Sequence, residues 1–172
     1  MNQKTRTRQI AVLSILMAIA IICSQFLKIG NESLQITFTF IPNSIIGALF
    51  GPLWSVIGLA VADVIGAALF PTGTFFIGFT LNAIISGFIY GYFLYRKPIT
   101  WSRVTIVVLL NTIIINVILT PIWIHLLYHT PFVVMMPARL IKQCITAPIE
   151  ILLMHLILNR LPLEKWRLRI GK

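Results

Sequence analysis

The side chains best suited to binding chemistry lie along one run of sequence near the carboxyl end. They are Arg139, Lys142, Gln143, Thr146 and Glu150. Spacings of three and four residues place all of them on a single face of an α-helix. Two cations, an amide and a carboxylate that share one face could together line a polar cavity. The rest of this run is apolar, so the polar face needs a protected environment.

The composition indicates what that environment is. The chain has 172 residues, of which 58% are hydrophobic and 10% charged, and its mean hydropathy is +0.95. A soluble domain is excluded by these values, and an all-α integral membrane protein is expected. We predict one membrane domain over residues 1–172 with no soluble domain attached.

Six apolar stretches predict six transmembrane helices, because a helix needs about 20 residues to cross the hydrocarbon. They cover residues 10–28, 35–50, 53–70, 75–95, 104–127 and 137–160. The second is short and interrupted at Pro42. Prolines at 42, 121 and 148 each remove an intrahelical hydrogen bond, which is expected to free the carbonyls of Phe38, Val117 and Cys144.

The cations give the expected orientation. Of the 14 Lys and Arg residues, those before the first span, in the fourth connection and after the last span all fall on one side of the membrane. By the positive-inside rule, both termini are predicted to be cytoplasmic in a multi-pass cell-membrane protein. The net charge of +10 then reflects topology, and a nucleic-acid partner is not expected because the chain offers no soluble basic surface. Lys28, Arg139 and Lys142 are the exceptions.

Polar side chains on other spans could join the face of the last one in a single cavity that opens outward. Each is costly in the membrane unless it faces protein or enclosed water. The candidate substrate-binding residues are Arg139, Lys142, Gln143, Asn82, Asn116, Phe75, Phe79 and Asp63. Arg139 is predicted to be the principal cation, although it could snorkel to the surface. Lys142 could instead neutralise an acid, and Asp63 or Asn116 could bond between helices.

Small residues at helical spacing mark two packing faces. The first span carries Ala11, Ser14 and Ala18, and the third carries Gly58, Ala62 and Gly66. Either face could pack inside the bundle or against another membrane protein.

Enzymatic chemistry finds little support in the sequence. The acids within spans, Asp63 and Glu150, are on separate helices, and no G-x-x-x-x-G-K-[ST] loop for ATP occurs. His125 and His129 have a spacing that can hold a metal, but no third ligand is near. We expect no cofactor, no metal site and no autonomous catalysis.

Three segments together resemble a known family. TFTFIPNSIIGALFGPLW, ADVIGAALFPTGTFFIGFTLNAIISGFIYGYFLY and TPFVVMMPARLIKQCITAPIEIL are similar to the folate-specific substrate-binding subunit, or S component, of energy-coupling factor vitamin transporters. The resemblance covers nearly the whole chain. It implies a cavity near the outer face, shaped by spans four to six and closed by loops at residues 28–35 and 71–76.

The resemblance also implies ligand and partners. Folate or a reduced folate would be bound, with Asn82, Asn116 and Gln143 near the pterin and Arg139 on a carboxylate. A membrane coupling subunit and two ATPases would drive transport, and the S component would topple in the membrane. The family's small-residue motif on span one contacts the coupling subunit. Ser14 replaces its usual alanine here.

Other readings stay open. An S component for another vitamin or a nucleobase-like compound would share this scaffold, and a small intramembrane enzyme is a more distant alternative. Metal-specific relatives typically begin with a Met-His pair, whereas Asn2 follows Met1 here.

Overall fold

The computed structural model describes residues 3–29, 36–70, 76–129 and 131–166. Its elements, in order, are α1 (Gln3–Phe26), β1 (Lys28–Ile29), β2 (Ile36–Thr37), α2 (Phe40–Phe50), α3 (Pro52–Leu69), α4 (Ile77–Leu94), α5 (Trp101–Asn111), the π-helix η1 (Thr112–Leu119), α6 (Thr120–Tyr128) and α7 (Phe132–Arg160). The two short strands pair antiparallel, with Lys28 opposite Thr37. The all-α fold class predicted from the sequence is confirmed apart from this small hairpin.

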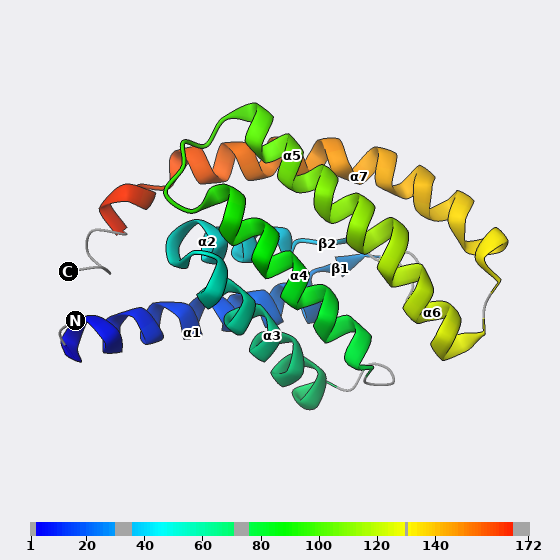
Figure 1. Ribbon diagram of the computed structural model, residues 1–172, viewed down its shortest axis with the longest axis horizontal. Helices are drawn as coiled ribbons and strands as arrows, with labels where there is room; N and C mark the ends of the chain where they lie inside the picture. The colour runs from blue at the N-terminus through cyan, green and yellow to red at the C-terminus, as the bar shows by residue number, and fades with distance from the viewer. Residues whose placement is uncertain (1–2, 30–35, 71–75, 130, 167–172) are drawn as a thin grey trace.

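The helices form an elongated bundle with both chain termini at one end (Figure 1). We call this the terminal end, and the opposite end, where α3 and α6 finish and α7 begins, the loop end. Both α4 and α7 run from the loop end towards the terminal end. Along each of these helices, residues with higher numbers therefore lie farther from the loop end. The segments α5, η1 and α6 follow one another without a gap from Trp101 to Tyr128.

Five helices in the described part of the chain are long and apolar enough to cross a membrane. The second predicted span is not one of them, since α2 has only 11 residues. Such a helix is about 17 Å long against a hydrocarbon core of about 30 Å. The apolar stretch 35–50 is divided between strand β2 and a short helix, which hydropathy alone does not separate.

Pro42 does not interrupt this helix, which corrects the sequence-based expectation. It is the third residue of α2, within the first turn, where a backbone N–H has no intrahelical acceptor. The carbonyl of Phe38 is not freed either, because it accepts a hydrogen bond of 3.2 Å from the N–H of Ile41. The helix ends instead at Gly51, whose φ of 82° suits glycine, and Pro52 begins α3.

Close backbone contact joins α4 to α2 and α3. A Cβ added at Gly87 would lie 2.7 Å from the carbonyl oxygen of Ser55, and one at Gly91 would overlap the backbone of Pro52. A Cβ at Gly47 would lie 2.6 Å from the Cβ of Tyr90. Glycine lets these helix backbones approach closely, as helices in membranes commonly do.

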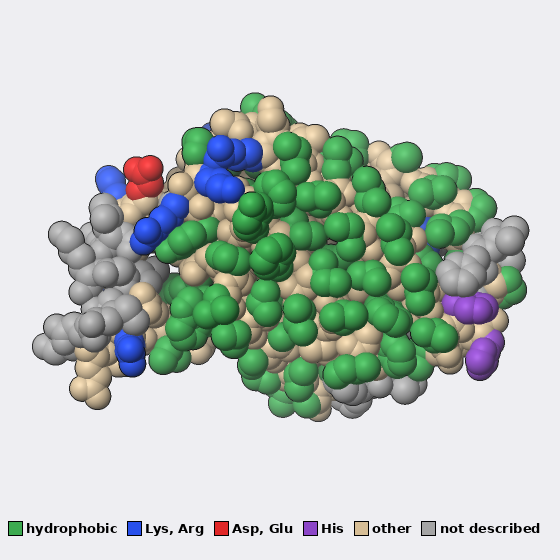
Figure 2. Space-filling view, in the orientation of Figure 1, with side chains coloured by type: hydrophobic (Ala, Val, Ile, Leu, Met, Phe, Trp, Pro, Cys, Tyr) green, Lys and Arg blue, Asp and Glu red, His purple; other side chains and the backbone are tan. Residues whose placement is uncertain are grey.

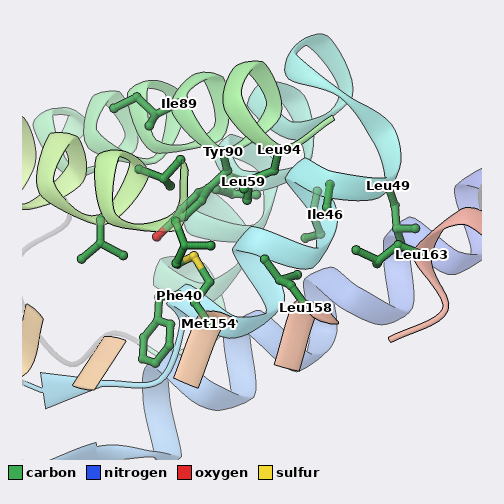
Figure 3. Close-up of a cluster of buried hydrophobic side chains, with 14 of the residues drawn as sticks. Phe40, Ile46, Leu49, Leu59, Ile89, Tyr90, Leu94, Met154, Leu158 and Leu163 are labelled. Atoms are coloured by element: carbon green, nitrogen blue, oxygen red, sulfur yellow. The ribbon is translucent and has the colours of Figure 1, made fainter. Parts of the chain in front are cut away.

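The apolar core lies towards the terminal end. It joins α2 and α4 to the second half of α7 through side chains such as Ile46, Leu94, Met154 and Leu158, each no more than 1% exposed (Figure 3). Outside this core, large apolar side chains cover most of the visible surface (Figure 2). An apolar exterior of this kind is expected where lipid is the solvent.

Candidate functional site

A cavity of about 170 Å³ lies between the start of α2, the middle of α4, the α5–η1 segment and α7. Its lining is strongly polar for a membrane protein. The lining residues are Thr37, Thr39, Phe40, Asn43, Ser86, Tyr90, Asn111, Ile115, Asn116, Lys142, Gln143, Thr146 and Glu150. Because polar groups in a membrane need a partner or a ligand, this cavity is the candidate binding site.

The polar face of α7 forms one wall of the cavity. Lys142, Gln143, Thr146 and Glu150 all line it, as their helical spacing predicts. Gln143 donates from Nε2 to the Thr112 hydroxyl at 2.9 Å, which fixes its amide. Lys142 and Glu150, a cation and an acid two turns apart on one helix, therefore line the same cavity.

The opposite wall is arranged by hydrogen bonds between α4 and α5. The Ser86 hydroxyl donates to Oδ1 of Asn111 at 2.8 Å, and Nδ2 of Asn111 donates to the Val107 carbonyl at 3.0 Å. These bonds hold the buried amide of Asn111 and the half-buried hydroxyl of Ser86 in fixed positions, which limits the conformational freedom that a ligand would otherwise have to remove.

The π-helix η1 shapes the cavity where the fifth predicted span passes it. Wider turns with i→i+5 hydrogen bonds occur at functional sites, and here they place Ile115 and Asn116 side by side in the lining. Pro121, the second residue of α6, follows directly and contributes no N–H. The irregularity that Pro121 predicts is thus present, as a π-helix beside the candidate site.

Four of the predicted site residues lie outside the cavity lining, Arg139 among them. Asn82 links α4 to α6, because its Oδ1 accepts from Trp123 Nε1 at 3.0 Å and its Nδ2 donates to the Thr120 hydroxyl at 3.2 Å. Asp63 accepts a 2.8 Å hydrogen bond from Thr80, joining α3 to α4.

Phe79 is the third, and it packs edge-on against Phe76 with ring centroids 6.2 Å apart. Phe75 lies outside the described residues, as do most residues of the two loops expected to close the site.

Arg139 also lies outside the lining, one turn closer to the loop end than Lys142. Its side chain is half-buried, and its Nε is buried without a hydrogen-bond partner in the described part of the chain. Lys142, in contrast, lines the cavity. The role of Arg139 as the principal ligand-binding cation stays a prediction.

Sequence reasoning missed several lining residues, among them Asn43, Tyr90 and Asn111. A signal for the two asparagines was present, since each is an amide within a predicted span, the same criterion that selected Asn116. Tyr90 carries no such signal, because an aromatic residue in a span is ordinary.

In the part of the chain that the structure describes, no three His, Cys, Asp or Glu residues stand close enough to hold a metal ion. The lining combines amide and hydroxyl groups with one lysine and one glutamate, which suits an organic ligand with charged and hydrogen-bonding groups.

The two small-residue faces have different surroundings. On α3, Gly58, Ala62 and Gly66 are buried, and a Cβ on Gly58 would lie 3.1 Å from the Leu13 side chain of α1. On α1 itself, the residues Ala11, Ser14 and Ala18 are exposed. The α3 face is thus used within the bundle, and the α1 face is left open.

Residues 8–158 match the sequence profile of a family described as "ECF transporter, substrate-specific component". The chain belongs to this family. The resemblance read from the sequence is confirmed, and this substrate-specific component is a multi-pass membrane protein in a family of transporter subunits rather than enzymes.

Two curated relatives are both described as the folate transporter FolT. The chain is 39% identical to a folate transporter, FolT, of Leuconostoc mesenteroides, over 91% of this chain and 87% of the relative. With a FolT of Clostridium novyi it shares 34% identity, over 83% of each chain.

Solved structures match the substrate-specific component as well. A crystal structure of FolT bound with folic acid is similar at 46% identity and a TM-score of 0.86, covering 91% of this chain and 95% of that one. An S-component for biotin from an ECF-type ABC transporter matches at 17% identity and a TM-score of 0.66, covering 96% and 98%. The biotin protein shares the fold alone.

Proposed function

We propose that this chain is the high-affinity folate-binding subunit of an ATP-driven importer of the energy-coupling factor class. The observation that carries the proposal is the similarity to FolT bound with folic acid, at 46% identity over 91% of the chain. Folate reaches the cell interior through a partner membrane subunit and two ATPases. The chain itself has no phosphate-binding loop of the G-x-x-x-x-G-K-[ST] type.

The cavity between α2, α4, η1 and α7 is the folate site in this proposal. Lys142, Gln143 and Asn116 contact the ligand, and Arg139 attracts its carboxylates at the rim. The polar lining and its placement beside a π-helix support this assignment. The cavity is supported from outside its lining by contacts that hold α3, α4 and α6 in place. These contacts are made by Asp63, Asn82 and Phe79.

Both termini lie in the cytoplasm, and the loop end faces outward. The visible Lys and Arg side chains gather mainly at the terminal end, whereas the His side chains of α6 lie at the loop end (Figure 2). This distribution supports the orientation, because cytoplasmic segments are enriched in Lys and Arg. The mouth of the cavity would then open to the outside, where folate is captured.

A titration of the purified protein with folic acid tests the proposal. Binding tighter than micromolar is expected, with no competition from biotin, riboflavin or thiamine. A copurifying compound with a pterin-like ultraviolet absorbance, displaced by added folic acid but not by riboflavin or thiamine, would add support. Preferential binding of another vitamin would show that this chain does not share the folic acid ligand of its FolT relative.

The exposed face of α1, formed by Ala11, Ser14 and Ala18, docks the coupling subunit in this proposal. Ala18→Leu would fill the close contact between helices that small residues permit. Folate uptake by cells with the whole transporter should then fall at least several-fold, while folate binding by the isolated protein stays unchanged. Ala68→Leu, on the exposed side of α3, is the matched control and should leave both intact. Equal uptake by the two variants would contradict this role for α1.

A further inference from the structure

The terminal end of the molecule carries an excess of positive charge beside an apolar surface. The connection between α4 and α5 lies at this end, and Figure 2 shows Lys and Arg side chains there that border the apolar face. Residues 95–103 contain three cations, Arg96, Lys97 and Arg103, and no acid. The whole chain has four acids, of which Glu164 follows α7 at the same end. Cations therefore outnumber acids around this connection.

Aromatic rings hold two of these cations in place. The Nζ of Lys97 lies 4.7 Å from the centroid of the Tyr92 ring and 5.8 Å from that of Phe93. The guanidinium carbon of Arg96 lies 5.1 Å from the centroid of the Tyr95 ring. A ring face attracts a cation but carries no net charge, and it leaves N–H groups of the cation for another acceptor. The rings thus position the two cations without neutralising them.

The third cation is tied to the backbone of the connection. The carbonyl oxygen of Pro98 accepts a hydrogen bond of 3.1 Å from the N–H of Thr100 and one of 3.4 Å from Nη1 of Arg103. Trp101, the first residue of α5, stacks on His155 of α7 with ring centroids 3.8 Å apart. These contacts fix the connection to its neighbours, which reduces the ordering that a bound anion would have to impose.

An exposed aromatic pair continues from the cations along α4. Phe88 and Tyr92 are one turn apart and each is 53% exposed. Their rings stack with centroids 5.7 Å apart and planes 16° apart. Because the Tyr92 ring also lies under Lys97, positive charge and exposed apolar surface adjoin at this residue. A ligand that fits both parts has an anionic head and a hydrocarbon tail.

Anionic phospholipids have this combination of groups. Their phosphate oxygens accept charge-assisted hydrogen bonds from Lys and Arg, and cations next to a membrane helix attract them. Tyr and Trp rings are enriched at the depth of the headgroups, which brings the cations beside them to the level of the phosphate. A soluble anion would use the cations alone, and a zwitterionic lipid would add a positive group next to three others.

We propose that the α4–α5 connection binds the headgroup of an anionic phospholipid in the leaflet at the terminal end, with one acyl chain against Phe88 and Tyr92. Arg96, Lys97 and Arg103 donate to the phosphate. None of these five residues lines the candidate cavity, so the lipid site is separate from it and does not depend on which vitamin the cavity holds.

Lipid selectivity of the purified protein tests the proposal. The protein in a neutral detergent receives equal amounts of phosphatidylglycerol and phosphatidylcholine with the same acyl chains, and native mass spectrometry counts the bound lipids. The wild type should bind phosphatidylglycerol at least 10-fold more tightly. Each cation at a membrane surface contributes about 5-fold to such binding, so most of the preference should be lost in the triple variant Arg96→Gln, Lys97→Gln and Arg103→Gln.

A second triple variant is the matched control. It removes the same charge from exposed positions at the same end of the molecule, away from the aromatic pair, and it should keep the preference. Its substitutions are Arg6→Gln, Arg160→Gln and Lys165→Gln. Equal losses in the two triple variants would show a diffuse attraction to the whole terminal end and would overturn the proposal.

Two further measurements separate the head of the lipid from its tail. Tyr92→Leu removes the ring under Lys97 and should lower the preference at least several-fold. Tyr128→Leu, at a residue that is 50% exposed at the loop end, should leave it unchanged. The soluble compound sn-glycerol 3-phosphate, which has no acyl chain, should not displace the lipid at equal concentration. Displacement by it would show a site for soluble anions instead.

An acidic protein surface is the other class of occupant. If the first triple variant copurifies less with the coupling subunit but keeps the wild-type lipid preference, the connection binds protein and the proposal is wrong. Should that variant fail to fold, Lys97→Gln is compared with Lys165→Gln. A loss of about 5-fold is then expected for the first substitution and none for the second, and equal effects would reject the site.

Discussion

At the scale of single residues, Asn82 holds helices together and does not line the cavity. Its amide group accepts from Trp123 and donates to Thr120, so both of its polar atoms are occupied. We predict that Asn82→Ala lowers the free energy of unfolding by about 1–3 kcal/mol, because it leaves buried groups unpaired. Thermal unfolding in detergent measures this effect. Asn159→Ala, which removes an exposed contact with His155, is the control, and an equal shift for both variants would contradict the prediction.

The sequence predicted cavity residues well where they share one helix. Lys142 and Gln143 were found because helical periodicity alone fixes which side chains of α7 point the same way. The sequence predicted the cavity residues poorly where they come from different helices. Asn82 and Asn116 are both amides within predicted spans, yet of these two only Asn116 lines the cavity. The face that one helix presents to another depends on how the helices pack. The spacing of residues along one helix does not contain that information.

At the scale of elements, the contact of α3 with α4 depends on glycine at defined positions. Gly87→Ala places a methyl group 2.7 Å from the Ser55 carbonyl oxygen, a backbone atom that cannot move without displacing α3. We predict a loss of about 1–3 kcal/mol in stability. Gly66→Ala is a matched change, because its nearest neighbours are Ile21 side-chain atoms at 3.7 and 3.8 Å, and it should be neutral or stabilising. Thermal unfolding of the two variants in parallel checks this; a smaller loss for Gly87→Ala than for Gly66→Ala would refute it.

The π-helix η1 gives a second prediction at this scale. Pro121→Ala restores a backbone donor after η1 and favours a regular α-helix, which would turn Asn116 away from its present position in the lining. Folic acid binding should weaken about 10-fold, the effect of roughly one hydrogen bond, while the protein stays folded. Pro98→Ala, in the exposed connection between α4 and α5, is the control. Unchanged affinity together with unchanged helical structure would show that Pro121 does not maintain η1.

The sequence predicted the long helices but not these details. Apolar length indicates a span reliably, whereas a π-helix has the same composition as an α-helix and is marked only by Pro121. The bounds of the elements within 35–50 could not be read from composition, because a strand followed by a short helix is as apolar as a continuous helix. Gly51 and Pro52 mark only where this short helix ends and the next one begins.

At the scale of the whole molecule, the orientation proposed here can be tested with single cysteines. After Cys23 and Cys144 are replaced with alanine, His129→Cys marks the loop end and Lys97→Cys the terminal end. A membrane-impermeant maleimide should label the first in intact cells and the second only after the membrane is opened. The reverse pattern would place the termini outside and would remove the charge-based support for an outward-facing cavity.

The buried cluster below Glu150 has a consequence for how a ligand can leave. Tightly packed side chains such as Leu94, Met154 and Leu158 stand between the cavity and the terminal end, so the cavity resembles a cup rather than a tunnel. A ligand in a cavity that is closed at one end leaves through the opening at the other end. If the ligand is delivered to the opposite side of the membrane, the mouth of the cavity has to be carried there or reshaped, as in a carrier and unlike in a channel.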